Sequence, residues 1–278
     1  MKKLTLLIIL LTQNSLASML PTNDLRIPMN QKSNIDQNQF NQTIDTIVDE
    51  FQIDLLSHGV SEIKVNKDWE SDRVNASAKK KDGIFQLNVY GGLGRHGLMN
   101  QDALALIVCH EIGHIVGGAP TWKPFSIASS EGQADYFATL KCFRRIHKKS
   151  QKEYLKEDVN ELAWNKCREQ YSQEQEFHLC LRSSKAQERL ALLLQTLSKE
   201  PKTPDFSTPD PYVIMFTLFN GYPNIQCRLD TLFAGSLCIN DTNELLDMKL
   251  YNKSVCSKFS NHKTGVRPKC WYVPTLDD

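Results

Sequence analysis

Two histidines and a glutamate lie close together at His110, Glu111 and His114, inside the apolar run 103–116. On an α-helix, residues four positions apart share a face one turn apart, so both imidazoles point in the same direction. One Zn²⁺ can then take a nitrogen from each ring, while the intervening carboxylate reaches a water on the open side of the metal. The spacing predicts a zinc site on one helix, with Glu111 as the base that activates a water.

A second acidic pair, Glu131 and Asp135, can complete such a site. A catalytic zinc needs three protein ligands and one open position for water. Sixteen residues separate His114 from Glu131, enough for the chain to turn back and present Glu131 as the third ligand. Asp135 lies one turn further on the same face, and we expect it to accept a hydrogen bond from the other nitrogen of a zinc-bound histidine.

Each of these residues also has an ordinary structural interpretation. The two histidines can be buried polar groups with partners, although such groups are costly in a core without a metal. Glu131 can be a first-turn acid that interacts favourably with the helix dipole, and Asp135 can be a surface charge. Four further histidines lie in charged or loop segments and are expected at the surface: His96, His147, His178 and His262.

The elements that must position these residues are predicted from hydrophobic periodicity. Apolar residues between Phe40 and Leu55 recur at helical spacing and predict a first helix that Gly59 ends. A lysine-rich turn is expected at 79–83, before the last of three strands. The strands are predicted at residues 63–65, 73–78 and 84–90.

Helices are predicted for most of the chain after these strands. Asn100 is placed as the N-cap of the zinc-binding helix 101–116, and a second helix is expected at 131–147. Residues 151–199 are amphipathic and helical in pattern, and the proline-rich joint 201–211 comes next. Because the strands precede the helices, we predict an α+β fold, with a small antiparallel or mixed sheet whose edge strand packs on the zinc-binding helix.

The start of the chain has the pattern of a secretory signal peptide. Two lysines, the apolar run 4–11 and the small residues Ser15 and Ala17 match its basic, apolar and cleavage regions. An uncleaved anchor is the alternative, although the run is shorter than the roughly 20 residues of a membrane span. We therefore expect removal near Ala17 and a periplasmic or secreted protein with no transmembrane segment in the mature chain.

These patterns divide the chain into three regions. Residues 1–17 form the signal peptide, 18–200 the main domain, and 201–278 a cysteine-containing extension packed on the same domain. The polar stretch 18–34 is expected to be loose.

All eight cysteines lie after the predicted cleavage point, and an even number in an exported chain favours disulfide bonds. We prefer Cys227 with Cys238 and Cys256 with Cys270, because both pairs close short loops. Cys109 either staples the zinc-binding helix or is a buried free thiol. The sequence does not indicate how the other four cysteines pair.

Several segments resemble a known family, the gluzincin metallopeptidases, and within it the CAAX-prenyl-protease type and its soluble bacterial periplasmic relatives. The resemblance covers residues 75–232. It rests on Asn75-Ala76-Ser77-Ala78 for the family's N-A-x-A, Val89-Tyr90-Gly91-Gly92-Leu93 for its strand ending in Gly-Leu, residues 110–114 and 131–135 for H-E-x-x-H and E-x-x-x-D, and Tyr222-Pro223 with Arg228-Leu229 and Leu232 for H-P-x-x-x-x-R-I-x-x-L.

The resemblance implies a zincin-like fold and a zinc-dependent endopeptidase that hydrolyses protein substrates outside the cytoplasm, with Glu111 as general base. It implies an extended protein or peptide substrate that adds to the strand 84–90. Tyr222 stands where the family has a histidine. Either its hydroxyl donates in place of that histidine to stabilise an oxyanion, or this step differs.

Two other classes of function remain open. The chain departs from the family in the short stretch between His114 and Glu131, in Tyr222 and in the unmatched segment 239–278. These departures fit a zinc-binding envelope chaperone or binding protein with little or no proteolytic turnover. A disulfide-stapled module without metal is the third alternative. Nucleic acid is not an expected partner, because 33 basic residues balance 32 acidic ones and no basic stripe is present.

Overall fold

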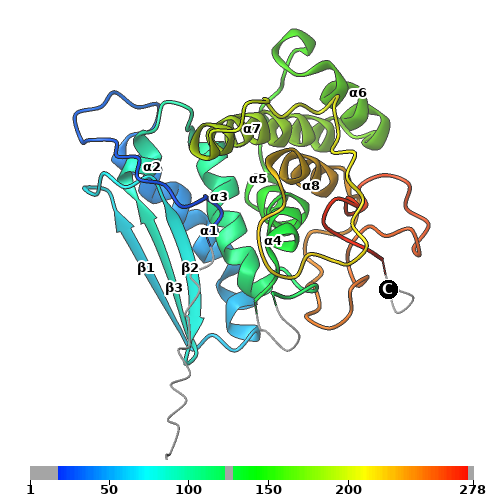
Figure 1. Cartoon of the computed structure of the whole chain (residues 1–278), viewed down its shortest axis with the longest axis horizontal. Helices are drawn as coiled ribbons and strands as arrows, with labels where there is room; N and C mark the ends of the chain where they lie inside the picture. Colours follow the sequence, from blue (N-terminus) through cyan, green and yellow to red (C-terminus); the bar gives the residue numbers. More distant parts are fainter. Residues whose placement is uncertain (1–17, 123–127, 275–278) are drawn as a thin grey trace, which may run out of the picture.

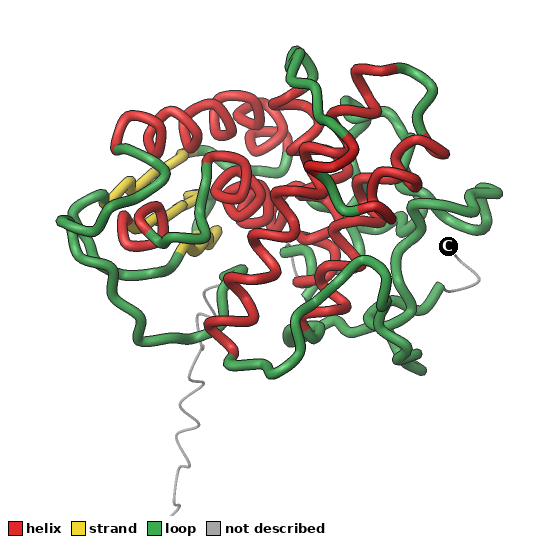
Figure 2. Tube along the Cα trace, turned by 90° about the horizontal axis from the view of Figure 1, so that it is seen from above, coloured by secondary structure: helices red, strands yellow, loops and turns green. Residues whose placement is uncertain are grey.

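A three-stranded sheet lies on one side of the molecule and helices make up most of the rest (Figure 1). The structure is a computed structural model, and it describes residues 18–122 and 128–274. The predicted signal peptide, residues 1–17, lies outside the described residues. Seen from above, the strands remain grouped at one side, and long loops surround the helices near the C-terminus (Figure 2). The arrangement is an α+β fold with a small mixed sheet, as predicted.

The sheet has the order β1-β3-β2, formed by β1 (Glu62–Asp68), β2 (Ala76–Lys81) and β3 (Ile84–Tyr90). β3 pairs in parallel with β1 and antiparallel with β2. The lysines predicted in a turn belong to β2, and the turn itself is Asp82-Gly83, where both residues have positive φ. Both edges of β3 are therefore occupied, so the prediction that β3 receives the substrate is wrong. β1 and β2 lie at the two edges of the sheet, and β2 packs on the helix over 101–116, which is predicted to bind zinc.

The helices follow the predicted order with shifted boundaries. The helix over 131–147 is continuous but passes through a π-helical turn, η1 (Ala138–Phe143). The α-helices are α1 (Gln37–Ser57), α2 (Gly91–Arg95), α3 (Gln101–Val116), α4 (Glu131–Phe137), α5 (Arg144–His147), α6 (Glu161–Gln170), α7 (Glu174–Ser198) and α8 (Ile225–Leu237), and a 3₁₀ turn, η2 (Lys156–Asp158), precedes α6.

α3 is the central helix of the fold. Asn100 caps it, its side chain accepting a hydrogen bond from the backbone N–H of Ala103, and Gly117 follows its last residue. From Asp102 onward every residue of α3 is buried, because α1, β2, α4 and α7 all pack around it. The predicted apolar face of α1 supplies much of that packing. A residue on α3 is thereby held rigidly.

Close contact between α3 and α4 depends on Gly113. A Cβ atom at this position would lie 2.8 Å from Cδ1 of Phe137 and 3.2 Å from the Cα atom of Ala134. The two helices can approach this closely only because α3 has no side chain there.

Replacing Gly113 with Ala is therefore expected to push α3 away from α4. Overpacking of this kind costs about 1–3 kcal/mol of unfolding free energy, measurable by urea denaturation. The control is Gly97→Ala, where a Cβ would meet nothing within 4 Å. Equal stability of the two variants would contradict this account of the contact.

The four disulfides differ from the preferred pairing. The bonds are Cys109–Cys142, Cys167–Cys180, Cys227–Cys270 and Cys238–Cys256. Cys227 lies in the first turn of α8 and Cys238 directly follows its last residue, so the helical rise over eleven positions separates them by about 16 Å. The short loop assumed between them is thus a rigid helix, and each end is tied to the C-terminal region instead.

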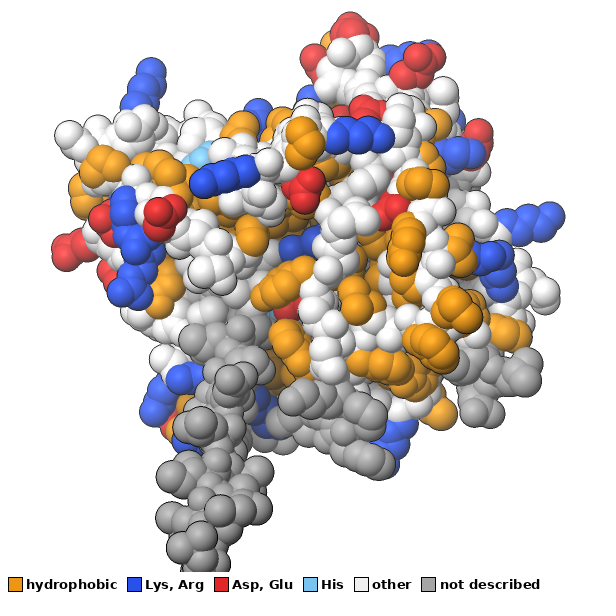
Figure 3. Space-filling model, in the orientation of Figure 1, with side chains coloured by type: hydrophobic (Ala, Val, Ile, Leu, Met, Phe, Trp, Pro, Cys, Tyr) orange, Lys and Arg blue, Asp and Glu red, His pale blue; other side chains and the backbone are white. Residues whose placement is uncertain are grey.

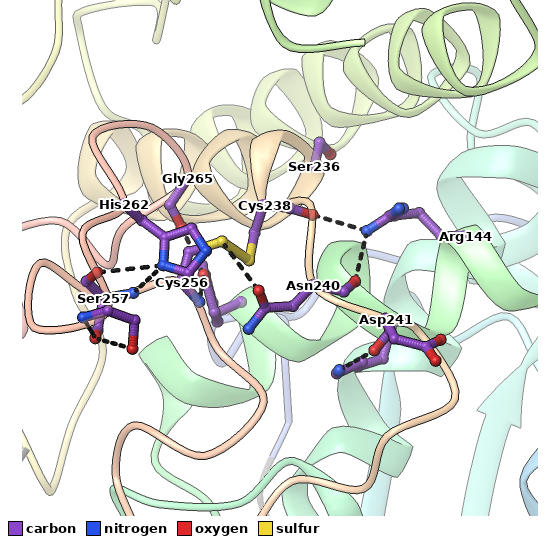
Figure 4. The surroundings of a disulfide bond; sticks show 12 residues. Arg144, Ser236, Cys238, Asn240, Asp241, Cys256, Ser257, His262 and Gly265 are labelled. Carbon is purple, nitrogen blue, oxygen red and sulfur yellow. Dashed lines mark hydrogen bonds between the residues drawn. A yellow bond between two sulfur atoms is a disulfide. The ribbon is translucent and has the colours of Figure 1, made fainter. Parts of the chain in front are cut away.

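Two of these bonds hold the helices that carry the predicted site. Cys109 is the staple rather than the free thiol, since it joins α3 to η1 directly beside His110. Cys238–Cys256 fastens the end of α8 to the C-terminal loops (Figure 4). There Arg144 of α5 donates hydrogen bonds to the carbonyl oxygens of Cys238 and Asn240, at 2.7 and 3.3 Å.

The predicted loose stretch 18–34 is wrong at its start. Met19 and Leu20 are 0% and 2% exposed and belong to the main hydrophobic core. The backbone alongside residues 72–76 supplies partners for this segment, including the hydrogen bond from the Ile27 N–H to the Asp72 carbonyl at 2.8 Å. The polar composition of the stretch as a whole hid the two apolar residues, Met19 and Leu20, that attach it to the core.

Apolar side chains are also exposed on the C-terminal face. Figure 3 shows hydrophobic side chains gathered where the loops after α7 and the last part of the chain lie. The most exposed are Met215 and Phe216. Among the described residues, no helix is both long and apolar enough to cross a membrane.

His147 and His178 are more enclosed than expected for surface histidines, with 18% and 16% of their side chains accessible, and His96 and His262 are partly exposed. His147 lies 3.6 Å from a carboxylate oxygen of Asp102. Burial, together with the charge of Arg182, lowers the pKa of His147 to about 4.

This pKa predicts acid sensitivity. Between about pH 6.5 and 4, His147 is protonated in the unfolded chain but not in the folded chain. The free energy of unfolding therefore falls as the pH falls through this window. A shift of this size corresponds to roughly 3 kcal/mol. Denaturation at pH 7 and pH 4.5 is expected to show a smaller loss for His147→Gln than for the unchanged chain, in the same metal state. Identical losses would show that His147 does not titrate in this way.

Candidate metal centre

α3 and α4 bring three predicted ligands together. His110 and His114 project from one face of α3, and their rings are 4.6 Å apart at 89°. Glu131, in the first turn of α4, lies 3.2 Å from His110 Nε2 through Oε2 and 3.8 Å from His114 Nε2 through Oε1. One ligand atom from each residue lies within 4.8 Å of the others. The loop after α3 therefore does return the chain as predicted.

The facing atoms of these three side chains suit a cation. His110 Nε2, His114 Nε2 and both carboxylate oxygens of Glu131 are buried, and none has a hydrogen-bond partner among the described residues. Leaving such groups unpaired in a core is costly. Two imidazole nitrogens and a carboxylate are the ligand set of a catalytic zinc site. The donor set thus fits Zn²⁺ with one position left for a water or substrate.

The far nitrogens of both imidazoles are held by acceptors. His110 Nδ1 donates to Asp135 Oδ1 at 2.7 Å, as predicted, and His114 Nδ1 donates to the backbone carbonyl of Ser129 at 2.9 Å. Because a carboxylate and a carbonyl can only accept, each Nδ1 carries the hydrogen. Nε2 is then the nitrogen that faces Glu131 and is available for a metal.

Asp135 is anchored in turn by Arg228 of α8. The guanidinium donates to both carboxylate oxygens, from Nε at 2.7 Å and from Nη2 at 2.8 Å. Asp135 is fully buried, so the alternative of a surface charge is wrong. Burial raises the pKa of Asp135, but Arg228 and His110 outweigh burial and lower it to about 2. The carboxylate therefore remains charged and keeps His110 oriented.

The two histidines have opposite pKa shifts without metal. Burial lowers both values, but for His110 the carboxylates of Asp135 and Glu131 outweigh burial and raise the pKa to about 9. For His114 burial dominates and lowers the pKa to about 4. A metal must therefore displace a proton from His110, so binding is expected to weaken as the pH falls.

Glu111 lies beside the cluster and is fully buried. Its Oε1 accepts a hydrogen bond from the backbone N–H of Met19 at 2.7 Å, whereas Oε2 has no partner among the described residues. Burial raises the pKa of Glu111 to about 7, partly offset by His110 and by the N–H groups of Met19 and Ala78. A carboxylate with such a pKa is well matched to accept and return a proton near neutral pH.

Tyr222 also reaches the site. Its ring stacks near the guanidinium of Arg228, at 5.8 Å from the ring centroid, and 46% of the residue is exposed. Burial at the hydroxyl end and the nearby carboxylates of Glu131 and Glu111 raise the pKa of Tyr222. The hydroxyl stays protonated and can donate a hydrogen bond.

All six predicted site residues are thus near one another. The sequence reasoning missed the roles of Arg228, Ser129 and Met19. Arg228 carried a signal, because it interrupts the apolar face of α8 between Cys227 and Leu232. Ser129 and Met19 act through backbone atoms, and such contacts cannot be predicted from the type of residue.

A second cluster of potential ligands, Asp210 with Cys227 and Cys270, does not offer thiolates. The two cysteines are joined in a disulfide.

Comparison of the chain with protein families, with curated proteins and with solved structures gives no match.

Proposed function

We propose that this protein is a zinc metallopeptidase of the gluzincin type, with a zincin-like arrangement of β2, α3 and α4. The observation that carries the proposal is the buried cluster of His110, His114 and Glu131, whose facing atoms lack partners among the described residues. The unpaired oxygen of Glu111 beside the cluster adds the base that hydrolysis requires. Zinc bound there would lower the pKa of a water towards about 7 and polarise a scissile carbonyl.

The protein's own residues have distinct tasks in this proposal. Glu111 accepts a proton from the attacking water and passes it to the nitrogen of the leaving amine. The protonated hydroxyl of Tyr222 donates to the oxygen on which negative charge develops. Arg228 and Asp135 hold the His110 ring in the orientation that exposes Nε2.

The outer edge of β2, which pairs with no other strand among the described residues, suits an extended protein or peptide substrate. Main-chain groups on an edge strand pair with an added strand regardless of its sequence. Ala78 presents its N–H towards Glu111, so a peptide on this edge would pass the cluster. The four disulfides support an oxidising compartment, and we include export from the cytoplasm in the proposal.

The experiment joins metal analysis to activity. Elemental analysis of the purified protein is expected to give one zinc per chain, and zinc is expected to raise the midpoint of thermal unfolding relative to the chelated protein. Unfolded casein should be cleaved by the zinc-loaded protein and not after chelation. Absence of zinc would reject the proposal.

A zinc-binding chaperone without turnover is the second candidate. The bond from Met19 to Glu111 favours it, because it engages one oxygen of the proposed base. Zinc at one ion per chain, with binding of unfolded casein but no cleavage, would support this candidate instead.

A further inference from the structure

The segment Ser18-Met19-Leu20 lies in the candidate site. The N–H of Met19 donates to Glu111 Oε1 at 2.7 Å, and its carbonyl accepts from Arg228 Nη1 at 2.5 Å. The Tyr222 hydroxyl also lies near the backbone of Ser18, which lowers its pKa slightly against the effect of burial. Glu111 and Arg228, proposed for chemistry and positioning, therefore both bind the backbone of Met19.

The segment runs along the chain that leads into β2. Ser18 Oγ donates to the Ala76 carbonyl at 2.7 Å, and Asn23 Nδ2 donates to the Val74 carbonyl at 3.2 Å. Arg26 and Arg73 form an antiparallel bridge. As residue numbers rise from 18 to 26, those of the partners fall from 76 to 73. The segment thus lies antiparallel to this edge, as an added strand does.

These contacts match those expected of a substrate backbone. In peptide hydrolysis the general base returns its proton to the nitrogen of the residue that follows the scissile bond. The nitrogen at Glu111 belongs to Met19, so Met19 stands where that residue would lie. Arg228, which binds the Met19 carbonyl, has a charged donor fully buried among carboxylates and pointing at the backbone.

The side chain of Met19 is buried close to the candidate site. It is 0% exposed and belongs to the main core. An unbranched apolar side chain therefore fills the space next to the base, and a charged one would be buried there without a partner.

We propose that residues 18–20 occupy the substrate cleft as an internal pseudo-substrate. The site accordingly selects extended peptides with an apolar residue after the scissile bond, and the resting protein is self-inhibited. The identity of the cleft as a substrate cleft rests on the proposed function, but its occupancy is tested by binding alone. A tethered occupant has a high effective concentration, so it suppresses binding in trans strongly even when its intrinsic affinity is modest.

The test compares zinc-loaded chains that begin at Ser18 and at Pro21. The probe is a fluorescein-labelled peptide, Ser-Met-Leu-Pro-Thr-Asn, followed by fluorescence anisotropy. The chain that begins at Pro21 is expected to bind the probe at least about tenfold more tightly. In the same preparation it should cleave casein at least about tenfold faster.

Point variants guard against loss of folding in the shortened chain. Met19→Pro removes the N–H that donates to Glu111 and keeps the chain length, whereas Met19→Leu keeps both that donor and an apolar side chain. Met19→Pro is expected to bind the probe and Met19→Leu to exclude it. Each variant must have the circular dichroism spectrum and the zinc content of the unchanged chain before its probe binding is compared.

The outcomes separate the two proposals. Probe binding to the shortened and Met19→Pro chains, without cleavage by either, supports the pseudo-substrate and rejects the peptidase. Equal probe binding and equal casein cleavage by all four chains overturns the pseudo-substrate and leaves the peptidase standing. A probe in which Asp replaces Met should bind at least about tenfold more weakly, since an unpaired carboxylate would be buried, and equal binding would overturn the proposed selectivity.

Discussion

Replacing Glu111 with Gln is expected to lower casein cleavage by about 10²- to 10⁴-fold, the usual contribution of a positioned general base. The amide keeps the shape of the side chain and an oxygen that can accept from the Met19 N–H. It cannot take a proton from water at neutral pH. Zinc content should stay at one ion per chain, because Glu111 is not among the three clustered ligands.

Two measurements keep this result interpretable. Glu131→Gln changes a carboxylate of the same size on the adjacent helix, and it should lower zinc content as well as cleavage. Because the unchanged chain is proposed to be self-inhibited, the comparison is best repeated in chains that begin at Pro21. Cleavage by Glu111→Gln at the unchanged rate would remove Glu111 from the mechanism.

Replacing Arg228 with Met is expected to lower the free energy of unfolding by about 3–5 kcal/mol. The variant leaves the Asp135 carboxylate fully buried beside His110 without its bidentate cation. The loss is greatest near neutral pH, where Asp135 is charged. Urea denaturation of the chelated protein measures this loss of unfolding free energy without a contribution from zinc.

A double-mutant cycle identifies the cause. Combining Arg228→Met with Asp135→Asn removes both charges, so much of the loss should be recovered. Arg189→Met is the control, since Arg189 is exposed on α7 and its replacement should change stability by no more than about 0.5 kcal/mol. A loss as small for Arg228→Met as for Arg189→Met would show that the buried pair is unimportant for stability.

The helix α3, with its two candidate zinc ligands, shows how much can be predicted from a short segment of sequence. Its cap at Asn100, its end at Gly117 and the common face of His110 and His114 are all predicted from residue types and spacing along one short segment. The same holds for the apolar face of α1. Such features depend on helical geometry, which is the same in any fold.

The sheet and the disulfides show which features cannot be predicted from local sequence. An alternating strand looks alike at the edge and in the centre, so the roles of β2 and β3 were exchanged. Loop length suggested Cys227 with Cys238, but the helix between them holds the two sulfurs apart. Pairing across long separations depends on which elements finally meet.

By itself, the sequence determined the identity of the candidate ligands, the proposed base and the carboxylate behind His110, because their spacing on two helices admits few other geometries. Only the tertiary structure decided that Arg228 neutralises that carboxylate and that Met19 reaches Glu111. Arg228 is 93 residues from Asp135, and Met19 is 92 residues from Glu111. Contacts over such distances arise from packing of whole elements and from backbone hydrogen bonds, which no local pattern encodes.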